Sequence, residues 1–263
     1  MGYRKRMGQN FLRDPNIAKR QVLLAGIEPG ERVLEIGGGH GILTKMLAET
    51  GADVTCIEKD PGLAAELCLA APSVNIIEAD ALDIRWPDFD RFVANIPYSI
   101  STDLTLKLLG CDFQRAVVMY QEEFARRLAA TTGSGDWSRL GVRAGYRHEL
   151  SIAFKVSRNS FYPPPKVDSA VVVIEPVEPM VDVLDENIFF ALVNILFSHR
   201  RKKARNNLIS GLHVLSRKSG VDENRIEDMV RVWDMGDERI ETISMEDIAD
   251  LSNIISGMGG QGD

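Results

Sequence analysis

The feature that most constrains the fold is a regular alternation of short apolar runs with helical patterns. Runs that could form buried strands recur at 31–36, 53–58, 74–79, 91–95, 115–120, 150–157 and 169–176. The spacing between the first five allows one helix between each pair, which is the βαβ signature of a parallel sheet covered by helices on both faces. The sequence therefore predicts a doubly wound α/β sheet of about seven strands, with the last hairpin antiparallel.

The pattern changes after Glu175. Pro176 and Pro179 mark a linker, and the stretches NIFFALVNILF, VDENRIEDMVRVW and SMEDIADLSNII that follow have a helical period without a strand candidate. We expect a catalytic doubly wound domain at residues 1–180. A small all-helical domain should then occupy residues 181–263 and end in a flexible tail.

A glycine loop follows the first predicted strand. Glu35 and Ile36 run into Gly37-Gly38-Gly39-His40-Gly41, and a helical pattern begins at Ile42. Glycines are needed where a strand turns sharply into a helix and a ligand must approach the backbone. The pattern E-I-G-x-G-x-G departs from the dinucleotide fingerprint G-x-G-x-x-G. It is typical of class I methyltransferases that use S-adenosylmethionine, but an ordinary glycine turn in another doubly wound protein is also compatible with the loop alone.

Carboxylates follow the next two strands. Glu58 ends the second strand, where it could accept hydrogen bonds from both ribose hydroxyls of a cofactor. Asp80 follows the third strand and could accept from the adenine amino group. Each alone could be a solvated charge at a strand end. Together with the glycine loop they predict one cofactor crevice at the carboxyl edge of the sheet.

The fourth strand ends in Asn95-Ile96-Pro97-Tyr98. This resembles the motif of methyltransferases that act on exocyclic amino groups of nucleobases. An asparagine side-chain oxygen and the next backbone carbonyl can accept both N–H groups of such an amine and stabilise the cationic nitrogen of the transition state. Tyr98 offers a face for stacking on the base, and Phe161, beside a run of three prolines, could close over a flipped base from the other side. The alternative for Phe161 is a purely hydrophobic packing role.

Charge is unevenly distributed along a chain whose net charge is −7. Arg4 to Arg6 form one basic cluster. A denser one within the helical part consists of Arg200, Arg201, Lys202, Lys203 and Arg205. A local patch decides phosphate affinity more than net charge does, so we expect these five side chains to contact RNA backbone. The alternative is a solvated helix end.

Other function classes are disfavoured. There is no apolar run of transmembrane length and no secretory signal pattern. The three cysteines form no CxxC pair and the four histidines show no metal-ligand spacing, so we expect a cytoplasmic protein without a metal.

With these residues in place, the chain resembles the KsgA/Erm family of rRNA adenine N6,N6-dimethyltransferases. The matching stretches run in order: Gln9–Leu12, Glu35–Gly41, Glu58–Asp60, Asp80–Asp83, Asn95–Tyr98, Phe161–Ala170 and Phe197–Leu208. The resemblance implies S-adenosylmethionine as cofactor. It also implies that the cofactor is held by Asn10, Leu12, Gly37, Glu58, Asp80 and Asn95. Asn95, Tyr98 and Phe161 would hold the target adenine.

The resemblance further implies a monomeric housekeeping enzyme of ribosome assembly. It would dimethylate two adjacent adenosines in the hairpin near the 3′ end of small-subunit rRNA, either free or in an assembling small subunit. Three alternatives stay open: an Erm-like enzyme acting on large-subunit rRNA, an assembly checkpoint factor whose binding matters more than its methylation, and a DNA adenine methyltransferase. The last shares the Asn95–Tyr98 motif but does not explain the other matches.

Overall fold

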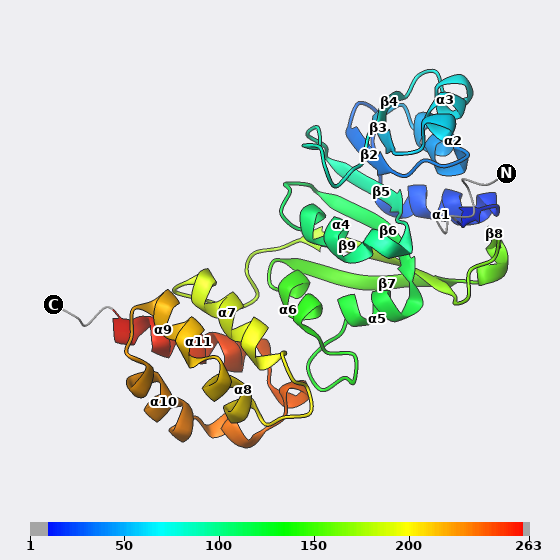
Figure 1. The fold of residues 1–263 in the computed structure, drawn as a ribbon. Helices are drawn as coiled ribbons and strands as arrows, with labels where there is room; N and C mark the ends of the chain where they lie inside the picture. The colour runs from blue at the N-terminus through cyan, green and yellow to red at the C-terminus, as the bar shows by residue number, and fades with distance from the viewer. Residues whose placement is uncertain (1–9, 260–263) are drawn as a thin grey trace. The chain divides into compact units, whose positions relative to one another are not determined.

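The computed structural model describes residues 10–259. The chain divides into two compact units (Figure 1). The sheet unit comprises the residues up to Arg126 together with Glu149–Pro176, and the helical unit comprises Arg127–His148 together with the residues from Val177 onward.

The sheet unit is built on a seven-stranded sheet with the order β4-β3-β2-β5-β6-β9-β7. Its strands are β2 (Arg32–Ile36), β3 (Asp53–Glu58), β4 (Asn75–Glu78), β5 (Arg91–Asn95), β6 (Arg115–Gln121), β7 (His148–Val156) and β9 (Ser169–Pro176). The strands from β2 to β6 pair in parallel, and β9 pairs antiparallel to β6. The prediction of a doubly wound sheet of seven strands is confirmed.

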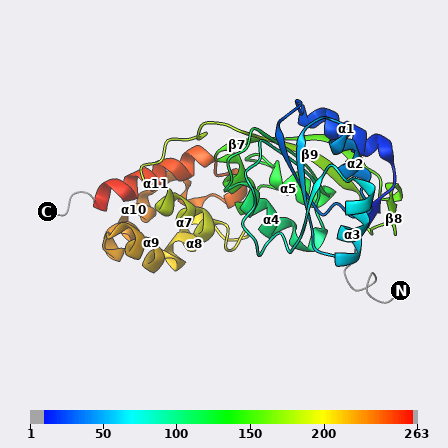
Figure 2. The same ribbon diagram turned by 90° about the horizontal axis from the view of Figure 1, so that it is seen from above.

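Helices cover both faces of this sheet. They are α1 (Pro15–Ala25), α2 (Ile42–Ala48), α3 (Pro61–Ala70), α4 (Ser101–Leu108) and α5 (Glu122–Leu128). Helices α1, α2 and α3 share one buried cluster with strand residues such as Val33 and Val117, and α1 and α4 lie on opposite sides of the sheet (Figure 2). The strand residues next to these, Leu34 and Val118, are also buried, because successive side chains of a strand point to opposite faces and both faces are covered.

A second, two-stranded sheet joins distant parts of the sequence. Strand β1 (Phe11–Leu12) pairs antiparallel with β8 (Phe161–Tyr162), so that Leu12 is opposite Phe161. Strand β8 ends where three prolines begin, which lack the N–H that a ladder requires. This pairing places the N-terminal segment against the proline loop.

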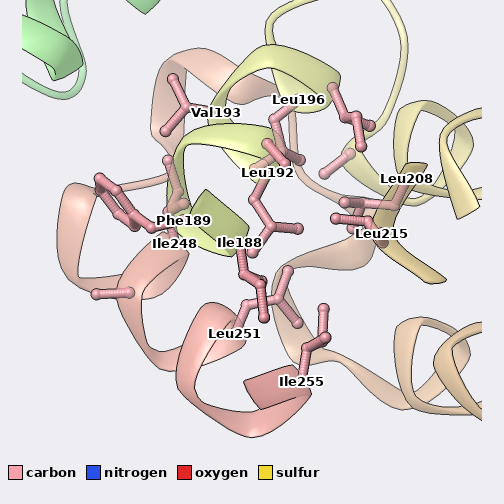
Figure 3. Close-up of a cluster of buried hydrophobic side chains, with 14 of the residues drawn as sticks. Ile188, Phe189, Leu192, Val193, Leu196, Leu208, Leu215, Ile248, Leu251 and Ile255 are labelled. Atoms are coloured by element: carbon pink, nitrogen blue, oxygen red, sulfur yellow. The ribbon is translucent and has the colours of Figure 1, made fainter. Parts of the chain in front are cut away.

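The helical unit contains no strand among its described residues apart from the start of β7. Its helices are α6 (Arg139–Gly145), α7 (Glu186–Leu196), α8 (Ala204–Ser210), α9 (Leu212–Ser219), α10 (Glu223–Val232) and α11 (Met245–Gly259). Helix α7 supplies the centre of the core, and Leu192 and Leu196 are fully buried among Leu208, Leu215 and Leu251 (Figure 3). The all-helical prediction for this part is confirmed.

The expected domain boundary at residue 180 differs from the observed division. Helix α6 belongs to the helical unit, because Trp137, Val142 and Tyr146 lie in its hydrophobic core. Trp137 also donates from Nε1 to the carbonyl oxygen of Ile243 over 3.1 Å. The predicted terminal tail lies largely outside the described residues. No helix within residues 10–259 has both the length and the apolar character needed to cross a bilayer.

Candidate active site

The carboxyl ends of the parallel strands β2, β3 and β5 converge on one pocket of the sheet unit. Sequence-predicted residues that line it are Asn10, Leu12, Gly37, Glu58, Asn95, Tyr98 and Phe161. They come from the N-terminal segment with β1, from the ends of β2, β3 and β5, and from β8, so segments distant in sequence build one cavity. In open α/β sheets this edge is where ligands bind.

The glycine loop forms the floor of the pocket with a backbone that only glycine adopts readily. Gly37, Gly39 and Gly41 have φ values of 75°, 55° and 79°, in the left-handed region that side chains disfavour. Gly38 is required for space: a Cβ there would lie 2.6 Å from Cys56 Sγ. The loop therefore presents bare backbone to whatever occupies the pocket.

Glu58 is fixed by two backbone amides. It is 4% exposed, and its Oε2 accepts from the Gly39 amide over 3.0 Å while Oε1 accepts from the Asp60 amide over 2.9 Å. Each carboxylate oxygen has two lone pairs, so both can accept one further hydrogen bond. A rigid acceptor with two oxygens at the pocket suits a vicinal diol such as a ribose.

Glu35 is a pocket residue to which the sequence alone assigns no role. Its side chain is buried, and Oε2 has no hydrogen-bond partner among the described residues. Burial raises the pKa of Glu35 to about 7, and the nearby Glu58 charge adds to the shift. A buried carboxyl oxygen without a partner is costly, so this position favours a ligand that donates a hydrogen bond or carries positive charge.

The N-terminal segment covers the glycine loop. The Phe11 ring lies so close that a Cβ on Gly39 would be 3.1 Å from it, and the same ring packs on His40 with centroids 4.4 Å apart. Asn10 and Leu12 flank Phe11 and also line the pocket. Phe11 and His40 were not predicted, although both lie inside matching motifs.

The motif at the end of β5 places the Asn95 amide and the Tyr98 phenol at the pocket. The Asn95 side-chain oxygen lies 2.9 Å from Gln21 Nε2, which donates to it. Tyr98 is half-buried, its hydroxyl lies 2.7 Å from Ser169 Oγ, and burial raises its pKa. A tyrosine with a raised pKa stays a neutral phenol and presents an aromatic face to the pocket.

The structure agrees only in part with the roles predicted for Phe161 and Asp80. Phe161 lines the pocket but is only 6% exposed and belongs to the hydrophobic core, so the packing role is part of what it does. Asp80 is not among the pocket-lining residues: Lys59 pairs with it and lowers its pKa, and its Oδ1 accepts from the Leu82 amide over 3.0 Å. Its contact with the cofactor stays a prediction.

The basic run lies in the helical unit, in the segment between α7 and α8 and in the first turn of α8. Arg200, Arg201, Lys202 and Lys203 are exposed, while Arg205 is partly buried. Arg200 donates from Nη2 to the Gly135 carbonyl over 2.8 Å. Lys203 and Arg205 share the Asp237 carboxylate, at 3.2 and 3.1 Å. Only Arg201 and Lys202 make no side-chain hydrogen bond or ion pair with another described residue. The Arg4–Arg6 cluster lies outside the described residues.

Comparison with known proteins identifies the family. The family model "Ribosomal RNA adenine dimethylase" matches residues 2–255. The chain belongs to the ribosomal RNA adenine dimethylase family. A "Probable ribosomal RNA small subunit methyltransferase A" from Thermococcus sibiricus is 39% identical over 252 residues, covering 95% of this chain and 90% of the relative. One from Methanococcus aeolicus is 38% identical over 265 residues, covering 96% of each chain.

Solved structures agree with the family. A dimethyladenosine transferase from Plasmodium falciparum superposes with a TM-score of 0.82 at 29% identity, over 95% of this chain and 98% of that one. The 23S rRNA methyltransferase ErmE gives a TM-score of 0.69 at 28% identity, over 92% and 98% of the two chains. The protein is therefore an rRNA adenine dimethyltransferase, and S-adenosylmethionine is its methyl donor.

The pocket fits this cofactor on three observations. The bare glycine loop admits a ligand against the backbone, and Glu58 has acceptor capacity left for ribose hydroxyls. Buried Glu35 has an unpartnered oxygen suited to an amino group. Adenosylmethionine carries both a ribose and an ammonium group, so the donor and acceptor sets of ligand and pocket are complementary.

Proposed function

We propose that this protein dimethylates N6 of two adjacent adenosines in the hairpin near the 3′ end of small-subunit rRNA, as a cytoplasmic monomer acting during subunit assembly. The observation that carries the proposal is the presence of Asn95 and Tyr98 in the same pocket as Gly37 and Glu58. A group that can hold an amine is thereby beside a site that can hold the methyl donor.

In the proposed site, Asn10, Leu12, Gly37, Glu58, Asp80 and Asn95 hold the cofactor, which supplies an electrophilic methyl group on its sulfonium sulfur. The Asn95 oxygen and the Ile96 carbonyl accept the two N–H groups of the target amine. This draws the N6 lone pair out of conjugation with the ring and stabilises the positive charge that develops on nitrogen. Once the N–C bond has formed, the excess proton would pass to water, so in the second transfer one N–H would remain for these two acceptors.

The aromatic side chains hold the base. Tyr98 is half-buried at the pocket, and Phe161 lines it from β8. A base extruded from an RNA helix loses stacking worth a few kcal/mol, and aromatic faces compensate for that loss. Neither residue needs to transfer a proton in this scheme.

The basic run of the helical unit would bind rRNA phosphates. Arg200, Arg201, Lys202 and Lys203 are all exposed in the segment that ends at the start of α8. The C-terminal helix dipole does not account for the run, because Lys203 is the N-cap of α8 and Arg205 lies in its first turn, where positive charge is disfavoured. An anionic partner would offset the repulsion among these side chains.

Between the two candidate substrates, we favour small-subunit rRNA over large-subunit rRNA. The relatives named small subunit methyltransferase A cover nearly the whole chain at 38–39% identity, whereas the 23S enzyme ErmE shares 28%. A role confined to binding, without methylation, is disfavoured, because the pocket keeps both Glu58 and Asn95 and hydrogen bonds hold the two side chains in place.

The test is methylation of immature ribosomal subunits. Purified protein and labelled S-adenosylmethionine are incubated separately with small and large subunits that lack the modification, and the modified nucleotides are mapped by mass spectrometry of RNA fragments. We expect N6,N6-dimethyladenosine at two adjacent positions near the small-subunit 3′ end. Label in large-subunit RNA alone would favour the Erm-like alternative, and tight binding without label would favour the checkpoint factor.

A further inference from the structure

Helix α1 carries a buried amide that contacts the chemical centre. Gln21 is 0% exposed, and its Nε2 donates to Asn95 Oδ1 over 2.9 Å. The residue does not line the pocket, whereas Asn95 does. Gln21 can therefore influence a bound substrate only through Asn95.

Stability alone would favour an apolar residue over glutamine at position 21. Its Oε1 is buried without a hydrogen-bond partner among residues 10–259, and leaving a buried polar atom unsatisfied costs about 1–3 kcal/mol. Its helix neighbours on the sheet-facing side, Ala18 and Ala25, are small apolar residues in the hydrophobic cluster. An apolar side chain at position 21 would avoid that cost.

The hydrogen bond restricts the group that must receive the target amine. An amide oxygen has two lone pairs; with one bound by Gln21, the direction of the other is fixed. Turning over the Asn95 amide alone would place its nitrogen against Gln21 Nε2, so the hydrogen bond opposes that rotation. Helix α1 packs against β5 and β6, so the donor sits on a rigid element.

We propose that Gln21 is a positioning residue, which fixes the Asn95 side-chain oxygen for the target amine at the expense of stability. The inference rests on the proposed role of Asn95 at the amine. A misplacement of about 1 Å can cost roughly 100-fold in rate, so loss of Gln21 should lower turnover without touching cofactor or RNA directly.

The first test replaces the amide by an apolar side chain of similar length, Gln21→Met. We expect single-turnover methylation of small subunits to fall roughly 10- to 100-fold, with a much smaller change in the Kd for S-adenosylmethionine, which Asn95 also helps to hold, and an equal or higher Tm. Val22→Ala is the matched control: it removes packing from the same helix and should lower Tm while leaving the rate unchanged.

The second test uses Gln21→Glu, whose carboxyl can donate to Asn95 only when protonated. Its methylation rate should decline with rising pH as this group ionises, and the ratio of wild-type to variant rates should rise accordingly. Because ionisation of a buried carboxyl also lowers stability, Tm is measured over the same pH range, and the decline in rate is expected at pH values where Gln21→Glu is still fully folded. Wild-type rates in Gln21→Met, or a Gln21→Glu profile parallel to that of the wild type, would overturn the inference. If the wild type itself fails to methylate rRNA, the proposed function fails instead.

Discussion

The Glu58 carboxylate accepts a hydrogen bond from the backbone amide of Gly39, with 3.0 Å between Oε2 and the nitrogen. The end of β3 is thereby tied to the glycine loop that follows β2. Because Oε1 also accepts from the Asp60 amide, the same side chain fixes the start of α3, whose N-cap is Asp60. Glu58 thus organises the pocket as well as facing it.

This double role shapes the first prediction. Glu58→Gln replaces one acceptor oxygen by a donor, so it should weaken S-adenosylmethionine binding by about 1.5–3 kcal/mol through removal of a charged hydrogen bond. Calorimetric titration measures the affinity. Both variants should also lower Tm: the Glu58→Gln amide nitrogen must face one of the two backbone N–H groups that Oε1 and Oε2 accept from, and Glu58→Ala leaves both without their acceptor. An unchanged Kd in both variants would remove Glu58 from the cofactor site.

The second prediction concerns Asn95→Ala. An interaction formed chiefly in the transition state affects rate more than ground-state binding. By comparison with removal of one oxyanion-hole donor, the single-turnover rate should fall on the order of 100-fold or more. Cofactor affinity should fall less, as titration with S-adenosylmethionine would show. Methylation at the wild-type rate would contradict the assignment of Asn95 to the amine.

The sheet could be predicted because its signal is local. Each of the strands β2 to β6 is a short apolar run beside a helical pattern, and its observed bounds differ from the expected ones by a residue or so. The β1–β8 sheet has no such signal, since each strand has two residues and they meet from distant parts of the chain. The cover that β1 provides over the pocket could be inferred only from the family resemblance.

Buried polar residues were the hardest to predict. On an isolated helix Gln21 would be expected to face solvent, and only the packing of α1 on the sheet shows that it is buried against Asn95. The basic run forms one patch in the sequence, yet Asp237, more than thirty positions away, pairs with Lys203 and Arg205. Such pairings depend on tertiary contacts that residue spacing does not encode.

The third prediction follows from Glu35, whose pKa burial raises to about 7 in the folded protein, above its ordinary value of 4.5. The folded state therefore holds this proton more tightly than the unfolded state. The resulting stability is fully present below about pH 4.5 and is lost as pH rises through 7. In the absence of cofactor, the free energy of unfolding should fall by about 3 kcal/mol over this pH range.

Glu35→Gln measures this contribution, because the amide does not titrate. Denaturant unfolding from pH 4.5 to 8 should show the free energy of unfolding of the variant gaining on that of the wild type across this interval. The other carboxylates are common to both proteins and cancel in the difference. A difference that does not change with pH would mean that Glu35 titrates normally.

The last prediction separates the cations of the basic run by what they contact. Arg201 and Lys202 are exposed and make no side-chain hydrogen bond or ion pair with another described residue, so both are available to phosphates, whereas Arg205 is engaged by Asp237. Arg201→Ala combined with Lys202→Ala should weaken small-subunit binding and flatten its salt dependence by about 0.7 slope units for each phosphate interaction removed.

Arg217→Ala combined with Lys218→Ala is the matched control, since these exposed cations lie in the last turn of α9 in the same unit. Binding across a salt series should leave the control slope unchanged, and cofactor affinity should be unchanged in both double variants. Equal slopes in the wild type and the Arg201/Lys202 variant would show that these two side chains contact no rRNA phosphate.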